Sequence, residues 1–481
     1  MQNLNQDWLK TQSSPQNFTL PEKVLQFGTG NFLRGYADWM IDLLNSANLF
    51  EGRIAVVQSS QSSSADKINQ QQGLYTVIER DHETEKVRLI TSLSRVLKAQ
   101  EDWAGIEALA ISPDLSLILS NTTEAGITYV KEDHLPGECQ ESFPAKLTAL
   151  LYKRFQTLGH KSGLIICPME LIENNGTILK QHILSHATDW GFEDDFTNYI
   201  HHECEFNNTL VDRIVSGYPE QDKSYYENKL GYEDANMLVC EPYHLLVIEN
   251  GEKLRSLLPL EKLELNVIFT DNLDKYRDAK VRFLNGAHTS SILSAYLCGC
   301  TTVLDMMQNP TLNKFLTHVL SEEISPGVSL SDQECQNYVN TIINRFSNPT
   351  LNHRLLDIAL NSLSKWKVRV LPSIKSYLDI THKLPEGLCF SLAALIYFYQ
   401  KGLGNSLDYS PQDDQAKLEV IKGTIALPIH ETCRTILSST ILWEEDLTKY
   451  QGLLEQLTQN LSDITNIGLE VSLNHFVSKI N

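Results

Sequence analysis

The stretch Lys23-Val-Leu-Gln-Phe-Gly28-Thr-Gly30-Asn-Phe-Leu-Arg34-Gly35 decides the fold expected for the N-terminal half of the chain. Its first five residues have the pattern of a short buried strand, and a glycine turn follows at once. A helical pattern comes next, and residues 53–57 form a second β-branched strand pattern. Strand, glycine turn, helix and strand within about 35 residues are typical of a βαβ unit that binds a dinucleotide.

The glycine turn is the expected cofactor site. Gly28 and Gly30 allow the backbone to approach a pyrophosphate closely, with Asn31 and Phe32 opening the helix whose N-terminus faces it. The third glycine of the common G-x-G-x-x-G motif is replaced by Leu33. Residues 57–62 contain neither an acid that would hold the ribose hydroxyls of NAD nor an arginine that would hold the 2′-phosphate of NADP. These residues therefore do not distinguish NAD from NADP as the cofactor.

Further short apolar strands are expected at residues 88–90, 115–119 and 163–167, with helical stretches between them. This alternation predicts an α/β fold with a Rossmann-type, doubly wound sheet over residues 1–274. The polar loop that follows residue 119 carries Thr122 and Glu124. Because ligands bind at the carboxyl ends of strands in such sheets, we expect both residues to contact the cofactor. For Glu124, a proton relay and an ordinary surface position are the alternatives.

Beyond residue 274 helical periodicity dominates, so residues 275–481 are expected to form a mostly α-helical substrate domain. The predicted helices include residues 311–321, 353–365, 388–400 and 443–457. The longest apolar run, near residues 388–399, is too short to span a bilayer and reads as a buried helix.

Composition narrows the class of protein. The chain has 481 residues and a formal net charge of -20, which argues against nucleic acid or an anionic membrane as a partner. Its start lacks the basic and apolar regions of a signal peptide. The nine cysteines are scattered and show no zinc-type spacing. We therefore expect a cytoplasmic protein with reduced thiols and no catalytic metal, and the sequence leaves the oligomeric state unknown.

Lys280, Asn285 and His288 are the candidate catalytic residues. On a regular helix they project at about 0°, 140° and 80°, which is one broad face. An amine that moves a proton, an amide that donates to an oxyanion and an imidazole suit the interconversion of a carbonyl and an alcohol. Taken singly, each residue is also compatible with an ordinary structural role.

Residues 361–369, Asn-Ser-Leu-Ser-Lys-Trp-Lys-Val-Arg, are the candidate substrate-anion site. If this segment is helical, Lys365 and Arg369 are i, i+4 neighbours, and a guanidinium can hold a carboxylate in a fork. A solvated basic helix face is the alternative.

Motifs spread along the whole chain resemble the mannitol dehydrogenase family of polyol-specific long-chain dehydrogenases. They are Phe27-Gly-Thr-Gly-Asn-Phe-Leu-Arg34, Asn121-Thr-Thr-Glu-Ala-Gly126, Thr209-Leu-Val-Asp-Arg-Ile-Val215, Glu241-Pro-Tyr243 and Lys280-x4-Asn285-x2-His288. Other stretches, among them Glu170-Leu-Ile-x-x-Asn-Gly176 and Ile358-Ala-Leu-Asn361, are similar to the branch of the family that acts on keto sugar acids.

The resemblance implies a metal-independent oxidoreductase that uses NAD and a small sugar-acid substrate. It implies that Lys280 is the general acid/base, that Asn285 donates to the oxyanion and that His288 positions the substrate. Lys365 matches a lysine that contacts substrate in the family, and Asn361 starts the same motif.

Two positions depart from the wider family. Leu171 stands where the family has an asparagine that serves as a second oxyanion donor, and the family's Asp-Gly-Ser-x-Lys becomes Asn361-Ser-Leu-Ser-Lys365. Either change fits an altered substrate. A polyol or a different keto sugar acid stays open as the substrate, as does a dinucleotide-binding regulator without catalysis.

Overall fold

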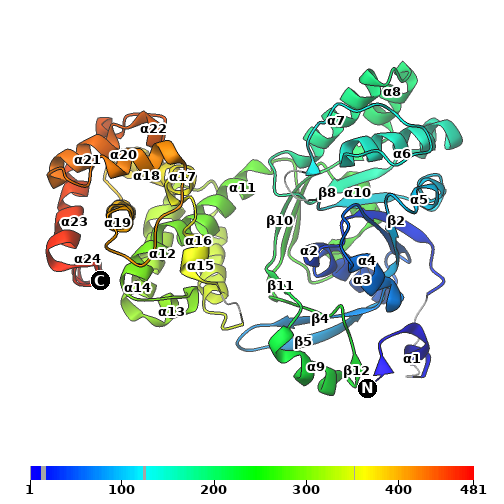
Figure 1. Ribbon diagram of the computed structural model, residues 1–481, viewed down its shortest axis with the longest axis horizontal. Helices are drawn as coiled ribbons and strands as arrows, with labels where there is room; N and C mark the ends of the chain where they lie inside the picture. Colours follow the sequence, from blue (N-terminus) through cyan, green and yellow to red (C-terminus); the bar gives the residue numbers. More distant parts are fainter. Residues whose placement is uncertain (1, 12–17, 123–125, 351–352, 481) are drawn as a thin grey trace. The chain divides into compact units, whose positions relative to one another are not determined.

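The computed structural model describes residues 2–11, 18–122, 126–350 and 353–480, and the chain divides into two compact units, Met1–Leu273 and Asp274–Asn481. Each unit is described by itself (Figure 1).

The first unit is built on a parallel sheet, as the sequence predicts. Within the described residues the strand order is β6 (Leu93–Lys98), β3 (Arg53–Gln58), β2 (Glu22–Phe27), β7 (Leu117–Ser120), β8 (Ile165–Pro168) and β9 (Glu205–Phe206). All five pairings are parallel. The chain runs from β2 to β3 and later returns to the other side of β2 as β7. The sheet therefore reverses its winding between β2 and β7, which is where doubly wound folds bind their ligands.

Alternating side chains of these strands pack on opposite faces of the sheet, as the pleat requires. On β2, Val24 lies in the core beneath α3 (Ala37–Ser46) and α4 (Ser64–Gln70), whereas Leu25 and Phe27 lie in the core on the other face. The helices that cover the other face are α5 (Trp103–Ala110), α6 (Phe143–Leu158), α7 (Asn175–Asp189) and α8 (Asp194–His202) (Figure 1).

The structure adds sheets that the strand patterns did not predict. One consists of β11 (Val215–Gly217), β13 (Leu238–Cys240), β4 (Tyr75–Arg80) and β5 (Glu85–Ile90), another of β10 (Asn208–Asp212), β14 (Leu245–Glu249) and β15 (Val267–Thr270), and β1 (Gln2–Asn3) pairs with β12 (Tyr232–Glu233). The strand expected at residues 88–90 exists as part of β5, but it belongs to an antiparallel pairing with β4 and lies outside the parallel sheet. Short apolar runs do not reveal which sheet a strand joins.

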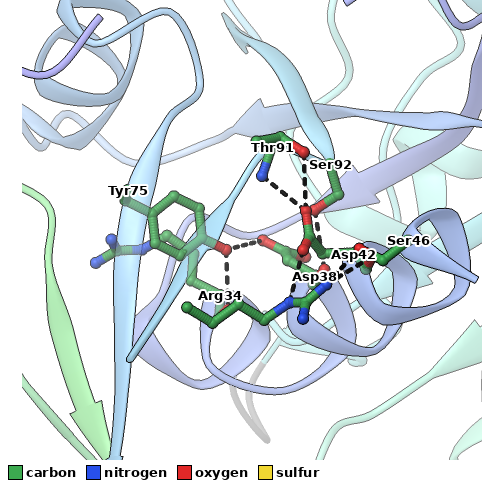
Figure 2. Close-up of polar contacts among 8 residues, drawn as sticks. Arg34, Asp38, Asp42, Ser46, Tyr75, Thr91 and Ser92 are labelled. Atoms are coloured by element: carbon green, nitrogen blue, oxygen red, sulfur yellow. Dashed lines mark hydrogen bonds and ion pairs between the residues drawn. The ribbon is translucent and has the colours of Figure 1, made fainter. Parts of the chain in front are cut away.

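Buried acids fasten α3 to β5 and to the loop after it (Figure 2). Asp42 accepts hydrogen bonds from Arg88 Nε at 2.7 Å and from the Thr91 backbone N–H at 2.7 Å. Asp38 is fully buried, its Oδ2 lies 3.3 Å from the Tyr75 hydroxyl, and burial raises the pKa of its carboxyl to about 8. These contacts hold α3, and with it the glycine turn that precedes the helix, against the second sheet.

The remaining elements of the first unit are short. They are α1 (Gln6–Thr11), α2 (Asn31–Arg34), α9 (Lys223–Leu230), α10 (Glu252–Leu257), η2 (His160–Ser162), η3 (Glu220–Asp222) and η4 (Leu260–Lys262).

The regular elements of the second unit, within its described residues, are helices that share one large core, and an isolated β-bridge joins Thr302 to Arg354. Its elements are α11 (Asp274–Lys280), η5 (Val281–Asn285), α12 (Gly286–Leu297), α13 (Val303–Gln308), α14 (Pro310–His318), η6 (Val319–Ile324), η7 (Ser325–Gly327), α15 (Asp332–Phe346), α16 (Leu355–Ile358), α17 (Ser362–Arg369), α18 (Leu371–Thr381), α19 (Glu386–Leu403), α20 (Gln415–Lys422), α21 (Ile429–Leu437), α22 (Thr440–Trp443), η8 (Leu447–Lys449), α23 (Leu453–Ile467) and α24 (Leu469–Lys479). The fold class predicted from sequence is thus confirmed.

Helix α19 is buried on nearly all sides and contains the helix predicted at residues 388–400. Its first turn is capped from outside the helix, because the buried Glu323 carboxylate accepts the N–H groups of Gly387 and Leu388, each at 2.7 Å. No described helix is both long enough and apolar enough to cross a membrane.

Three helix predictions need correction. Residues 353–365 do not form one helix, because Asn361 adopts the left-handed conformation (φ 56) and separates α16 from α17. Residues 443–457 are interrupted in the same way at Glu444 (φ 63). The α-helix expected at residues 311–321 ends at His318 and continues as a π-helix. A single left-handed residue can end a helix without changing the apolar periodicity of the sequence, so the periodicity does not predict such a break.

Candidate functional site

The residues proposed for the cofactor gather at the carboxyl ends of β2 and β7, on either side of the point where the sheet reverses. Gly28 follows β2 with φ +119, and a Cβ added there would lie 2.8 Å from the carbonyl oxygen of Asn121, at the end of β7. Only glycine meets both conditions. Gly30 has φ -64 and no atom within 4 Å of an added Cβ, so its lack of a side chain leaves open space before α2.

The other cofactor candidates are held by their neighbours. Asn31 accepts a hydrogen bond from Arg34 Nη2 at 2.6 Å, and Phe32 stacks on Tyr36 with ring centroids 4.8 Å apart. Thr122 donates its backbone N–H to Glu170 Oε1 at 2.9 Å. Glu124 lies outside the described residues.

Glu170 is a buried residue that the motifs did not single out as functional. Its carboxylate accepts the N–H and hydroxyl of Thr122 and the hydroxyl of Ser120. Burial raises the pKa of the Glu170 carboxyl, while these donors oppose the rise. The contacts fix the end of β7 and the residues that follow it, where the candidate cofactor residue Thr122 lies. A lone acid beside a β-strand gives no local signal of this role.

Leu171, which stands where the resemblance implies a second oxyanion amide, is 62% exposed. Neighbouring Asn175 cannot take over that role, because it is fully buried and its Nδ2 donates to Pro168 O at 3.1 Å and to Thr209 Oγ1 at 3.0 Å. Asn174 adopts the left-handed conformation at the N-cap of α7.

In the second unit a π-helical turn brings Lys280 and Asn285 closer in angle than the sequence predicts. Element η5 begins directly after Lys280 and ends at Asn285, and the Gly286 N–H bonds to Val281 O, five residues back. On an α-helix, residues five apart diverge by about 140°. A π-turn is wider than an α-turn, so five residues advance less far past one full turn. Such turns recur at functional sites. The angle expected between Lys280 and Asn285 from a regular α-helix is thus corrected. Both side chains are partly exposed.

His288 lies one turn further along α12, stacked on Phe346 with ring centroids 4.2 Å apart. Its Nε2 is buried and has no hydrogen-bond partner among the described residues. Burial and the nearby positive charges of His353, Arg345, Arg369 and Lys365 lower the pKa of His288 to about 3. The imidazole is therefore neutral at ordinary pH.

Helix α17 places Lys365 and Arg369 one turn apart, beside α12. A Cβ added at Gly286 would lie 3.3 Å from the Arg369 carbonyl oxygen, so the absence of a side chain lets α17 approach closely. Lys365 Nζ donates to Ile358 O at 2.8 Å, and burial together with Arg369 lowers the pKa of Lys365. Asn361 is exposed at the far end of the same helix, and its side chain makes no capping bond.

Arg369 is partly buried, and its guanidinium makes no hydrogen bond or ion pair with any residue that the structure describes. A desolvated guanidinium without a partner is costly. Arg345 and His353, which sequence reasoning missed, also lower the pKa of His288. The sequence spacing of these two residues does not indicate a place near His288, because only the tertiary fold brings them close to α12. The arrangement suits a small anion. Among the described residues no group of His, Cys, Asp and Glu could hold a metal ion.

Both halves of the chain match family models. The mannitol dehydrogenase Rossmann domain matches residues 22–262, and the mannitol dehydrogenase C-terminal domain matches residues 272–465. Altronate oxidoreductase of Halalkalibacterium halodurans is 39% identical over 96% of this chain and 94% of that protein. Altronate oxidoreductase of Bacillus subtilis is 38% identical over 95% of each.

Two solved structures share the fold. The ternary complex of Pseudomonas fluorescens mannitol 2-dehydrogenase with NAD and D-mannitol gives a TM-score of 0.71 at 20% identity, covering 99% of this chain and 100% of that one. Substrate-free D-sorbitol dehydrogenase gives a TM-score of 0.82 at 18% identity, covering 98% of this chain and 100% of that one.

Proposed function

We infer the function of this chain from the premise that it belongs to the mannitol dehydrogenase family. We propose that it interconverts D-tagaturonate and D-altronate with NADH and NAD, in the breakdown of hexuronates and without a metal. The near-full-length similarity to altronate oxidoreductases supports the substrate class. The observation that carries the proposal is the partly buried Arg369 guanidinium beside Lys365, which has no partner among the residues that the structure describes, since a polyol offers a guanidinium no charge to pair with.

NAD fits the first unit. The close approach at Gly28 and the open space at Gly30 suit a pyrophosphate, with Asn31, Phe32 and Thr122 around it. Lys98, which pairs with Gln58 across β3 and β6, is engaged by Asp66 at 3.0 Å and does not offer a free charge for the 2′-phosphate of NADP. NADH, when bound, supplies the hydride.

Lys280 is the proposed proton donor for reduction. It delivers a proton to the alkoxide oxygen that forms from the keto group, and Asn285 donates its amide N–H to the same oxygen as charge develops. Such a donor stabilises an oxyanion by about 2.7–4 kcal/mol in a dry site. The neutral His288 is proposed to position a substrate hydroxyl, and it adds no competing charge.

Arg369 and Lys365 are the proposed partners of the substrate carboxylate. A guanidinium and a carboxylate form two parallel hydrogen bonds, which fixes the orientation of the sugar chain as well as its affinity. The net charge of -20 repels anions at long range, so the local positive cluster of Arg345, Lys365 and Arg369 has to supply the attraction.

A panel of ketoses tests the proposal. The full chain with NADH is given D-tagaturonate, D-fructuronate and D-fructose in turn, and NADH absorbance is followed. We expect the highest kcat/KM with D-tagaturonate. Faster turnover of D-fructose would contradict the sugar-acid assignment, and NADH binding without turnover of any ketose would favour a regulator.

Two variants complete this test. Lys280→Ala should abolish turnover and leave the Kd for NADH within about twofold, because the lost group moves a proton and lies outside the nucleotide unit. Lys275→Ala is the matched control on the same helix, where the ammonium lies over the Tyr276 ring. Wild-type turnover in Lys280→Ala would contradict the role of Lys280.

A further inference from the structure

Helix α17 begins without a cap of its own. Its N-cap residue Asn361 is left-handed, at φ 56 and ψ 38, and its side chain makes no hydrogen bond to the first turn. The first N–H groups of any helix lack intrahelical partners and need acceptors from elsewhere. The start of α17 is largely buried, at Ser362 and Leu363, so water cannot serve both groups.

Asp413, from the segment between α19 and α20, supplies the missing acceptor. Its Oδ2 accepts the Leu363 N–H at 2.9 Å and the hydroxyl of Tyr399 at 2.7 Å. The same Tyr399 hydroxyl accepts the Ser362 N–H at 3.1 Å. One carboxylate, with one buried tyrosine, therefore satisfies the first two N–H groups of α17, and its charge is favourable at a helix N-terminus.

The segment that carries Asp413 is itself fixed to the start of the helix. Asn361 N–H bonds to Gln412 O at 2.9 Å, and the hydroxyl of Ser364 donates to Asp413 Oδ1 at 3.3 Å. Lys417 Nζ donates to the same Ser364 hydroxyl at 2.6 Å. These contacts determine both where α17 starts and how it is rotated.

The rotation of α17 matters because the helix is only eight residues long and carries both anion-binding candidates. Each residue advances the helix by about 100°, so a shift of the start by one residue would turn Lys365 and Arg369 away from His288. The middle of the helix is held by Trp366, which is fully buried and donates to Ser391 Oγ at 3.2 Å.

We propose that Asp413 is a positioning residue for the substrate carboxylate: by capping α17 from outside, it sets Lys365 and Arg369 against His288. The inference rests on the proposed function and deepens it. Asp413 belongs to none of the family motifs, and it accepts the hydrogen bond that the side chain of the N-cap residue Asn361 does not accept.

Asp413→Asn tests the inference in the full chain. The amide keeps the size of the side chain but loses the charge and one acceptor. Because a displacement of about 1 Å can cost up to about a hundredfold, we expect the KM for D-tagaturonate to rise by about tenfold or more. The value of kcat should fall less, and the Kd for NADH should not change.

Asp414→Asn is the matched control. Asp414 caps α20 by accepting the N–H groups of Ala416 at 3.0 Å and Lys417 at 3.3 Å, and α20 carries no proposed site residue. Because asparagine caps a helix about as well as aspartate, this variant should leave α20 and its stability nearly unchanged and keep its KM within about twofold. Equal KM changes in the two variants would overturn the inference.

A double variant separates positioning from general loss of structure. If Asp413 acts through Lys365 and Arg369, Asp413→Asn added to Arg369→Leu should raise KM by less than the product of the two single effects, whereas independent effects would multiply. Should Asp413→Asn fail to fold, Tyr399→Phe removes the hydroxyl that joins the carboxylate to Ser362, and the same split between KM and kcat is expected.

The outcomes for the two proposals are distinguishable. An unchanged KM in Asp413→Asn, or multiplied effects in the double variant, overturns the positioning role alone. Absence of keto-acid turnover in the unmodified protein overturns the proposed function and this inference with it.

Discussion

Gly28 and Gly30 lie two residues apart in the same turn, and the structure predicts opposite consequences when each is replaced by alanine. At Gly28, φ is +119 and the new Cβ would lie 2.8 Å from the Asn121 carbonyl oxygen. At Gly30, φ is -64 and an added Cβ meets no atom within 4 Å. Gly28→Ala should therefore damage the fold, and Gly30→Ala should affect only what binds there.

The magnitudes follow from the backbone. Holding a non-glycine residue in a sparsely populated region costs about 1–3 kcal/mol, and the contact with Asn121 adds to this. For a unit of this size, we expect Gly28→Ala to lower the Tm by about 2–10 °C. Gly30→Ala carries no strain and restricts the unfolded chain, so its Tm should be unchanged or slightly higher, by the equivalent of about 0.4–1 kcal/mol.

For cofactor binding we expect the larger effect from Gly30→Ala. A methyl group at Gly30 occupies the space that a pyrophosphate would enter, so the Kd for NADH should rise by about tenfold or more, or about 1.4 kcal/mol. Calorimetric unfolding without NADH and fluorescence titration with NADH measure the two effects separately.

Two results would refute the reasoning. A Gly28→Ala variant with a wild-type Tm would show that the turn does not need its positive φ. A Gly30→Ala variant that binds NADH as tightly as wild type would show that the cofactor does not approach this part of the backbone.

Two further predictions concern stability. Glu323→Gln should lower the free energy of unfolding by about 1–3 kcal/mol, because an amide cannot accept both buried N–H groups of α19. Thermal unfolding measures the effect, with Glu322→Gln at an exposed position as the control. Equal stability of the two variants would contradict the capping role of Glu323. Asp38 has a pKa raised to about 8 by burial, so the unfolded chain releases the Asp38 proton at about pH 4 while the folded chain holds it, and stability falls between about pH 4 and 8. Asp38→Asn should remove that decline in urea unfolding measured at about pH 5.5 and 7.5; an unaltered decline would show that Asp38 does not titrate this way.

The sequence by itself determined the features that depend on neighbours along the chain. The pattern of residues 23–35 predicted a strand, a glycine turn and a helix, and β2, Gly28 and the helices after it have that order. The apolar run at residues 388–400 predicted a buried helix, which is α19. Lys365 and Arg369 were expected one turn apart on a helix, and α17 contains both. Local periodicity carries this information because the side chains of one element share a repeating geometry.

Only the tertiary structure decided how these elements meet. It placed residues 88–90 in an antiparallel pairing, broke the expected helix at Asn361 and widened the turn between Lys280 and Asn285. Arg345 and His353 reach His288, and Asp413 reaches Leu363, across long separations in sequence. The physical reason is that buried N–H groups and charges take whichever partner the fold brings within reach. The sequence shows which residue types could serve as such partners, but it does not show which of them lie close together in the folded protein.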